Sequence, residues 1–218
     1  MAEEDESRRQ GREGERAGQA HGEYDVGRLL ALSDGVFAIA MTLLVLDIPV
    51  PSRITANSDA ALQAALRSLY APVLAFVLSF LLVGLTWLRH RSMLRGLART
   101  DGGLAWINLL MLLLVCLVPF TAAVLSRHGD LATAVVLYAA NMALVGVAGL
   151  GLRWRCWHGG LLRTPLTTAE RRTAMLDSLL SIGVFGVSMP IALFSPTAAE
   201  AVWFASGFLS FRRGAHRH

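Results

Sequence analysis

Long apolar runs, separated by short polar segments that contain arginine, occupy most of this chain. Six runs stand out, at about residues 29–49, 70–88, 104–125, 131–152, 174–194 and 197–211. The third and fourth exceed about 18 residues and carry no formal charge, which is the pattern of a membrane-spanning helix. The sixth is shorter and contains Glu200. The pattern predicts an all-α integral membrane protein with six transmembrane helices per subunit.

The two ends of the chain differ from its middle. Residues 1–22 are polar, mixed in charge and nearly free of large apolar side chains, so they cannot bury a core. We expect a disordered cytoplasmic N-terminus over residues 1–22 and a single membrane domain over residues 23–211. Residues 212–218 are then a short basic cytoplasmic tail.

Composition and charge agree with a multi-pass membrane protein. Hydrophobic residues make up 54% of the chain and charged residues 17%, outside the usual range of soluble domains. If both termini are cytoplasmic, seventeen arginines lie in inside segments, and the outside loops hold Arg53, Arg67 and Arg127. This bias follows the positive-inside rule. The net charge of +4 therefore reflects topology, and no nucleic-acid partner is predicted.

The first apolar run has a carboxylate towards each end. Asp34 and Asp47 are thirteen residues apart, roughly 20 Å along a helix, whereas the hydrocarbon core of a bilayer is about 30 Å thick. At least one carboxylate of a spanning helix therefore lies at hydrocarbon depth. Such a group is costly unless it faces a partner or water, which makes it a candidate functional residue.

The same helix carries a one-sided stripe. Ile39, Thr42, Leu43 and Leu46 fall within about one 100° sector of a helical wheel, with Gly35 beside them. A stripe like this usually packs against neighbouring helices, but the flanking carboxylates favour a pore wall. In a ring of copies, the three apolar side chains would form constrictions that gate by dewetting, and Thr42 would offer a hydroxyl. Six helices leave little room for a pore within one subunit, so we expect a symmetric oligomer.

Three segments resemble one known family. The segment R-L-L-A-L-S-D at Arg28–Asp34 is similar to the pattern R-x-x-x-F-S-D, with Leu32 in place of phenylalanine, and continues as G-V-F-A-I-A-M-T-L-L-V-L-D-I-P-V-P. The others are W-L-R-H from Trp87 and N-L-L-M-L-L-L-V-C-L-V-P-F from Asn108. Together they resemble the transmembrane protein 175 family, potassium-permeable channels of endolysosomes and of many prokaryotes. The likeness covers about residues 24–125.

The resemblance implies a homotetramer in a prokaryotic plasma membrane, permeable to K⁺ and other monovalent cations and without a cofactor. Its first helices line the pore, and no backbone-carbonyl filter is present. Ile39 would be the narrow ring, continued outward by Leu43 and Leu46, while Thr42 tunes selectivity and Asp47 attracts cations at the outer mouth. A polar network would form at the start of the first helix from Arg28, Ser33, Asp34, His90 and Asn108.

A secondary transporter and an enzyme are the two other classes of protein to compare with a channel. Asp34 and His90 could form a proton relay in a proton-coupled secondary transporter. A transporter of this kind usually contains an internal repeat, yet no counterpart of S-D-G occurs in the fourth run. Enzymatic activity is not expected, since neither G-x-S-x-G nor H-E-x-x-H is present, and no cysteine cluster indicates a metal.

Overall fold

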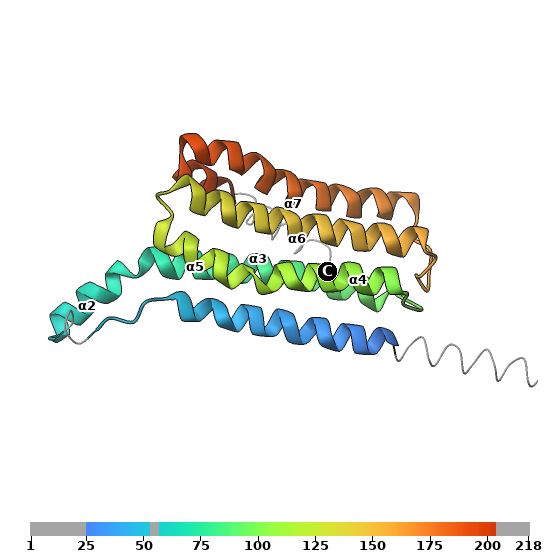
Figure 1. Cartoon of the computed structure of the whole chain (residues 1–218), viewed down its shortest axis with the longest axis horizontal. Coiled ribbons are helices and arrows are strands. Elements are labelled where there is room, and N and C mark those ends of the chain that lie inside the picture. The colour runs from blue at the N-terminus through green and yellow to red at the C-terminus, as the bar shows by residue number, and fades with distance from the viewer. Residues whose placement is uncertain (1–24, 53–56, 204–218) are drawn as a thin grey trace, which may run out of the picture.

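A computed structural model describes residues 25–52 and 57–203, which are helical apart from short connections and one isolated β-bridge. The first helix runs over Asp25–Asp47, and its last turn is the 3-10 helix η1 (Leu44–Asp47). The others, labelled in Figure 1, are α2 (Asp59–Ser68), α3 (Tyr70–Arg95), α4 (Gly102–Cys116), α5 (Val118–His128), α6 (Ala132–His158) and α7 (Thr168–Phe194). Residues 196–203 form a further helical segment.

Five helices in the described part of the chain are long and apolar enough to cross a membrane. They are the first helix, α3, the consecutive pair α4 and α5, α6 and α7. The first five predicted runs therefore correspond to these elements. The sixth run begins in the helical segment 196–203, but residues 204–211 lie outside the described residues, as do residues 1–22 and 212–218.

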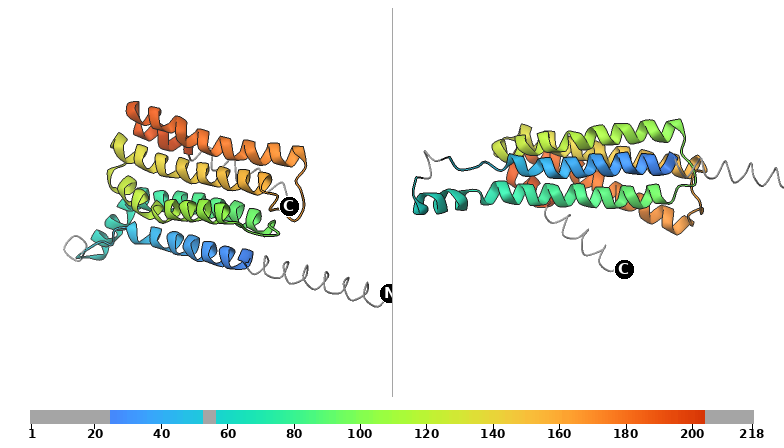
Figure 2. Two further views of the ribbon diagram at one scale, coloured as in Figure 1. Left: turned by 45° about the vertical axis from the view of Figure 1, so that its right-hand side comes forward. Right: turned by 90° about the horizontal axis from the view of Figure 1, so that it is seen from below.

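The long helices lie side by side in an elongated bundle (Figure 1). The first helix follows one edge, α7 follows the opposite edge, and α3, α4, α5 and α6 lie between them. The left view of Figure 2 shows the same arrangement, and in the right view, from below, the first helix runs between α3 and the pair α4 and α5. In both views α2 extends beyond one end of the bundle. The first helix therefore has neighbours on one side, and its other side is open in this single subunit.

The span made by α4 and α5 is interrupted at Leu117, two residues before Pro119. Proline has no backbone N–H and cannot continue the hydrogen-bond pattern of the preceding turn. Asn141 on α6 reaches the turn before this break, where its side-chain amide donates to the Leu114 carbonyl at 3.3 Å. A buried polar side chain on a neighbouring helix thus bonds the backbone just before the break.

An aromatic cluster joins α6, α7 and the segment after α7, on the side of the bundle away from the first helix. Tyr138 on α6 lies between Phe185 on α7 and Trp203, with ring centroids 6.5 and 5.2 Å away. The Tyr138 hydroxyl donates to Ser79 on α3 at 3.1 Å, which satisfies the polar end of a fully buried ring. Trp203 is also fully buried, so the segment that follows α7 packs back onto the bundle.

Arginine is concentrated at one end of the bundle. In the described residues, that end carries Arg28, Arg89, Arg91, Arg95, Arg99, Arg153, Arg155, Arg163, Arg171 and Arg172, and the other carries Arg67 and Arg127. The loops at the arginine-rich end are joined by backbone hydrogen bonds from Ala98 to Leu161 and from Arg163 to Gly96. Arg155 also pairs with Asp101 at 2.6 Å.

Candidate functional site: the first helix and its polar contacts

A buried hydrogen-bonded chain joins the first helix to α3 and α4. His90 Nε2 lies 2.7 Å from the side-chain oxygen of Asn108, and the Asn108 amide donates to Ser33 Oγ at 3.2 Å. Ser33 in turn donates to the Leu29 carbonyl at 2.8 Å. Because the Asn108 oxygen can only accept, His90 carries its proton on Nε2 in this arrangement. All three polar side chains are at least 97% buried.

Asp34 belongs to a second set of contacts, adjacent to the first. Trp87 Nε1 donates to its Oδ1 at 2.7 Å, and Arg91 Nε lies 3.8 Å from its Oδ2. The second distance is that of an ion pair and is too long for a hydrogen bond. Arg91 also lies over the Trp87 ring, with its Cζ atom 5.1 Å from the ring centroid. Asp34 therefore meets a donor and a cation, both from α3.

The structure thus brings four of the five predicted network residues together, in two sets. Ser33, His90 and Asn108 share one hydrogen-bonded chain, and Asp34 is bound by α3 beside it. Arg28 lies five residues before Ser33, and its side chain is exposed. The functional role of all five residues stays a prediction.

The first helix has two different faces. Its buried face carries side chains at helical spacing, namely Val26, Ser33, Phe37, Ala40 and Leu44. On the opposite side, Ile39, Leu43 and Leu46 are 61%, 43% and 74% exposed. Thr42 is exposed beside them and donates its hydroxyl to the Ile39 carbonyl at 2.8 Å. The stripe singled out in the sequence is therefore the surface that its own subunit leaves uncovered.

Asp47 ends the first helix at the end of the bundle opposite the arginines. Its side chain is partly buried, and Arg127 at the end of α5 is the cation that acts on it. A nearby arginine weakens the attraction of this carboxylate for a passing cation. That Asp47 attracts cations at the outer mouth therefore stays a prediction, and Arg127 offsets part of the charge on which it depends.

Two contacts at the site were not foreseen from the sequence. Trp87 lies outside the predicted polar network, but it hydrogen-bonds Asp34. Phe37, in the middle of the buried stripe, lies against His90 with ring centroids 5.5 Å apart. The signal for Trp87 was its spacing: it precedes His90 by three residues and Arg91 by four, so the three lie on neighbouring faces of one helix.

These features define a polytopic helical membrane protein whose first helix is fastened by a buried polar chain and exposes an apolar stripe. Comparison with known proteins gives the family. Residues 28–119 match the family model of the endosomal/lysosomal potassium channel TMEM175. The chain is 37% identical over 179 residues to a potassium channel of Streptomyces collinus, covering 77% of this chain and 85% of that protein.

A second relative, a potassium channel of Chamaesiphon minutus, is 31% identical over 192 residues, which cover 87% of this chain and 92% of the relative. The crystal structure of a lysosomal potassium-selective channel TMEM175 homolog from the same organism superposes with a TM-score of 0.76 at 29% identity. That match covers 87% of this chain and 98% of the solved one. The chain belongs to the TMEM175 family.

Proposed function

We propose that this protein is the subunit of a homotetrameric, potassium-permeable cation channel in a prokaryotic plasma membrane. Family membership and relatives named as potassium channels support conduction of K⁺. The observation that carries the proposal for this chain is the exposed stripe of Ile39, Thr42, Leu43 and Leu46, opposite the buried face of the first helix. Four such stripes facing one axis would form the pore.

The chemistry of the stripe suits a hydrophobic gate. Rings of Ile39, Leu43 and Leu46 would exclude water when narrow and so block ions without a charged plug. Thr42 lies between them, and its hydroxyl proton is given to the Ile39 carbonyl. The oxygen's remaining lone-pair capacity then faces outward, where it offers a cation a ligand. A pore without a ring of backbone carbonyls offers few such oxygens, so we expect modest selectivity.

The rest of the assembly follows from the same arrangement. The concentration of arginine at one end supports a cytoplasmic location for that end and, with a sixth span, for both termini. The burial of Trp203 supports this sixth span over residues 197–211, since the segment after α7 turns back along the bundle. Asp47 then lies at the outer mouth.

The polar chain at the start of the first helix supports a positioning role better than a proton relay. Its hydrogen bonds run from His90 through Asn108 and Ser33 to the Leu29 carbonyl, an oxygen that does not take up a proton at neutral pH. Asp34, the other half of the proposed relay, has its hydrogen bond with Trp87. We therefore assign Arg28, Ser33, Asp34, His90 and Asn108 to holding the pore helix in place.

The test is ion flux from liposomes that contain the purified protein, with K⁺ and Na⁺ measured separately. The Ile39→Asn variant puts an amide in the constriction, and we expect it to raise K⁺ leak. The matched control is Val187→Asn, which makes a similar change at an exposed site on α7, at the opposite edge of the bundle. An increase in K⁺ leak in Ile39→Asn that is absent in Val187→Asn supports a gate at Ile39.

Other outcomes contradict the proposal. Equal K⁺ leak in both variants would mean that any exposed amide perturbs the protein, and Ile39 would no longer be assigned to the gate. If neither wild type nor Ile39→Asn passes K⁺ without a coupling ion, the chain is not a passive channel. Flux that requires a proton gradient would instead favour the secondary transporter, with Asp34 and His90 as its first candidates.

A further inference from the structure

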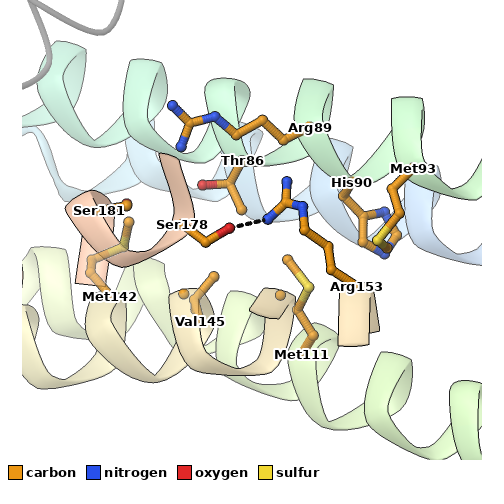
Figure 3. A pocket seen from close by; sticks show the side chains of 12 residues that line it. Thr86, Arg89, His90, Met93, Met111, Met142, Val145, Arg153, Ser178 and Ser181 are labelled. Carbon is orange, nitrogen blue, oxygen red and sulfur yellow. Dashed lines mark hydrogen bonds between the residues drawn. The ribbon is translucent and has the colours of Figure 1, made fainter. Parts of the chain in front are cut away.

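A cavity separate from the exposed stripe lies inside the bundle near its arginine-rich end. It measures about 50 Å³ and is bordered by α3, α4, α6 and α7. Figure 3 shows its lining: Thr86 and Arg89 on α3, Arg153 on α6, and Ser178 and Ser181 on α7, together with three methionines. Hydroxyl groups and guanidinium groups therefore line one cavity. Of the hydrogen-bonded residues Ser33, His90 and Asn108, only His90 borders it.

Positive charge exceeds negative charge at this cavity. Arg153 reaches across it and donates to Ser178 Oγ at 2.6 Å (Figure 3). Arg89 and Arg153 lie close enough to repel each other, and Asp177 on α7 offsets part of the charge of Arg153. Two guanidinium groups with one carboxylate leave a surplus positive charge. Half-buried arginines that border a cavity in this way are typical of a site for an anion.

The depth of the two arginines indicates which anion. Arg89 is nineteen residues from the start of α3, and Arg153 is twenty-one residues from the start of α6. At about 1.5 Å per residue, each lies roughly 30 Å from the opposite end of its helix, which is the thickness of the hydrocarbon core. Both guanidinium groups are therefore at the level of the lipid headgroups at the arginine-rich end.

Size restricts the ligand further. A cavity needs about 10–15 Å³ of free volume for each water-sized group. The volume of about 50 Å³ therefore holds roughly four such groups. That suits one phosphate group and excludes a sugar headgroup with several phosphates. We propose that the cavity binds the phosphate group of a simple anionic phospholipid, such as phosphatidylglycerol, through Arg89 and Arg153. Basic pockets between transmembrane helices bind anionic headgroups in this way.

The experiment measures lipid binding by the full-length protein in detergent, using native mass spectrometry and thermal unfolding. The probes are phosphatidylglycerol, phosphatidylcholine and inorganic phosphate. We expect phosphatidylglycerol to bind and to raise the melting temperature more than either other probe. Arg89→Gln and Arg153→Gln should each weaken phosphatidylglycerol binding roughly fivefold, the factor expected for one basic residue at a membrane surface.

Two further variants sharpen the test. Arg95→Gln removes the same charge from an exposed position further along α3, and should bind phosphatidylglycerol like wild type. Arg89→Lys keeps the charge and should retain most of the affinity. If Arg153→Gln does not assemble, because it loses the bond to Ser178, the comparison of Arg89→Gln with Arg89→Lys still decides the question.

Three results would overturn the proposal. Unchanged affinity in Arg89→Gln and Arg89→Lys alike would remove the cavity from lipid binding. An equal loss in Arg95→Gln would mean diffuse attraction to the whole basic end. Full stabilisation by inorganic phosphate alone would identify a free oxyanion as the ligand. Lipid binding is measured without ion flux, so its failure is distinct from a failure of the channel proposal.

Discussion

His90 on α3 and Asn108 on α4 are joined by a buried hydrogen bond of 2.7 Å, and the same Asn108 side chain donates to Ser33 on the first helix. One amide thus joins the first helix, α3 and α4. The exposed stripe of the first helix can line a pore only if the helix is fixed in rotation. We propose that Asn108 supplies that restraint from the buried side.

Replacing Asn108 should therefore loosen the first helix. Asn108→Ala leaves His90 Nε2 without a partner in a buried site, which costs about 1–3 kcal/mol, and removes one of the two hydrogen bonds of Ser33 Oγ. We expect a lower melting temperature in detergent and a smaller fraction of assembled oligomer on size exclusion. Asn57→Ala, at an exposed position before α2, is the control and should change neither. An Asn108→Ala protein as stable as wild type would show that the fold does not need these buried hydrogen bonds.

Trp87 is expected to fix Asp34 through its indole N–H. Trp87→Phe removes the 2.7 Å hydrogen bond but keeps an aromatic ring beneath Arg91. Hydrogen bonds to charged groups contribute about 1.5–3 kcal/mol, and partial exposure of Asp34 puts this one near the lower limit. Thermal unfolding should show the loss. Trp106→Phe, at an exposed site early in α4, makes the same chemical change as a control, and an equal shift there would contradict the assignment.

Gly146 allows α6 and α7 to approach closely. A Cβ atom at this position would lie 2.8 Å from Ile182 Cγ1 on α7, closer than van der Waals contact allows. Gly146→Ala should therefore destabilise the protein, because overpacking costs about 1–3 kcal/mol and the gain in helix propensity is about 1 kcal/mol. Gly183→Ala on α7 meets nothing within 4 Å and should be neutral or stabilising. Melting curves of both variants test this prediction. A Gly183→Ala protein as destabilised as Gly146→Ala would contradict the role of close helix approach at Gly146.

Much of the fold could be predicted because lipid imposes strong rules on sequence. Uninterrupted apolar length marks a span, and arginine marks one side, so the runs from residue 29 to residue 194 match five helices. Local interruptions were harder to predict. Just before the break at Leu117, the Leu114 carbonyl accepts from Asn141, which is twenty-seven residues further along the chain, and the sequence does not reveal that pairing.

The site was only partly predictable for a related reason. Helical spacing placed Ile39, Leu43 and Leu46 on one face, since that depends on one helix alone. The partners of Asp34 and His90 depend on how three helices dock, and spacing within one helix says nothing about docking. The family resemblance supplied the membership of the polar network. It did not reveal that Trp87 would take the hydrogen bond of Asp34.

Asp101 links the stability of the arginine-rich end to pH. Its side chain accepts from the Leu104 N–H at 2.7 Å and pairs with Arg155 at 2.6 Å. The backbone hydrogen bond from Leu104 foremost, and Arg155 after it, hold the pKa of this carboxyl below its usual value. A group with a lowered folded-state pKa stabilises the protein above its unfolded-state pKa, about 3.9. That contribution is lost as the pH falls through the folded-state pKa.

Asp101→Asn tests this directly, because asparagine can still cap α4 but has no charge to titrate. We expect the variant to melt below wild type at pH 7, and the difference to shrink as the pH falls below about 4. Melting curves between pH 7 and pH 3 measure the gap. Asp59→Asn, at the exposed start of α2, is the control and should follow wild type throughout. A gap that stays constant down to pH 3 would mean that lost geometry, and not lost charge, destabilises the variant.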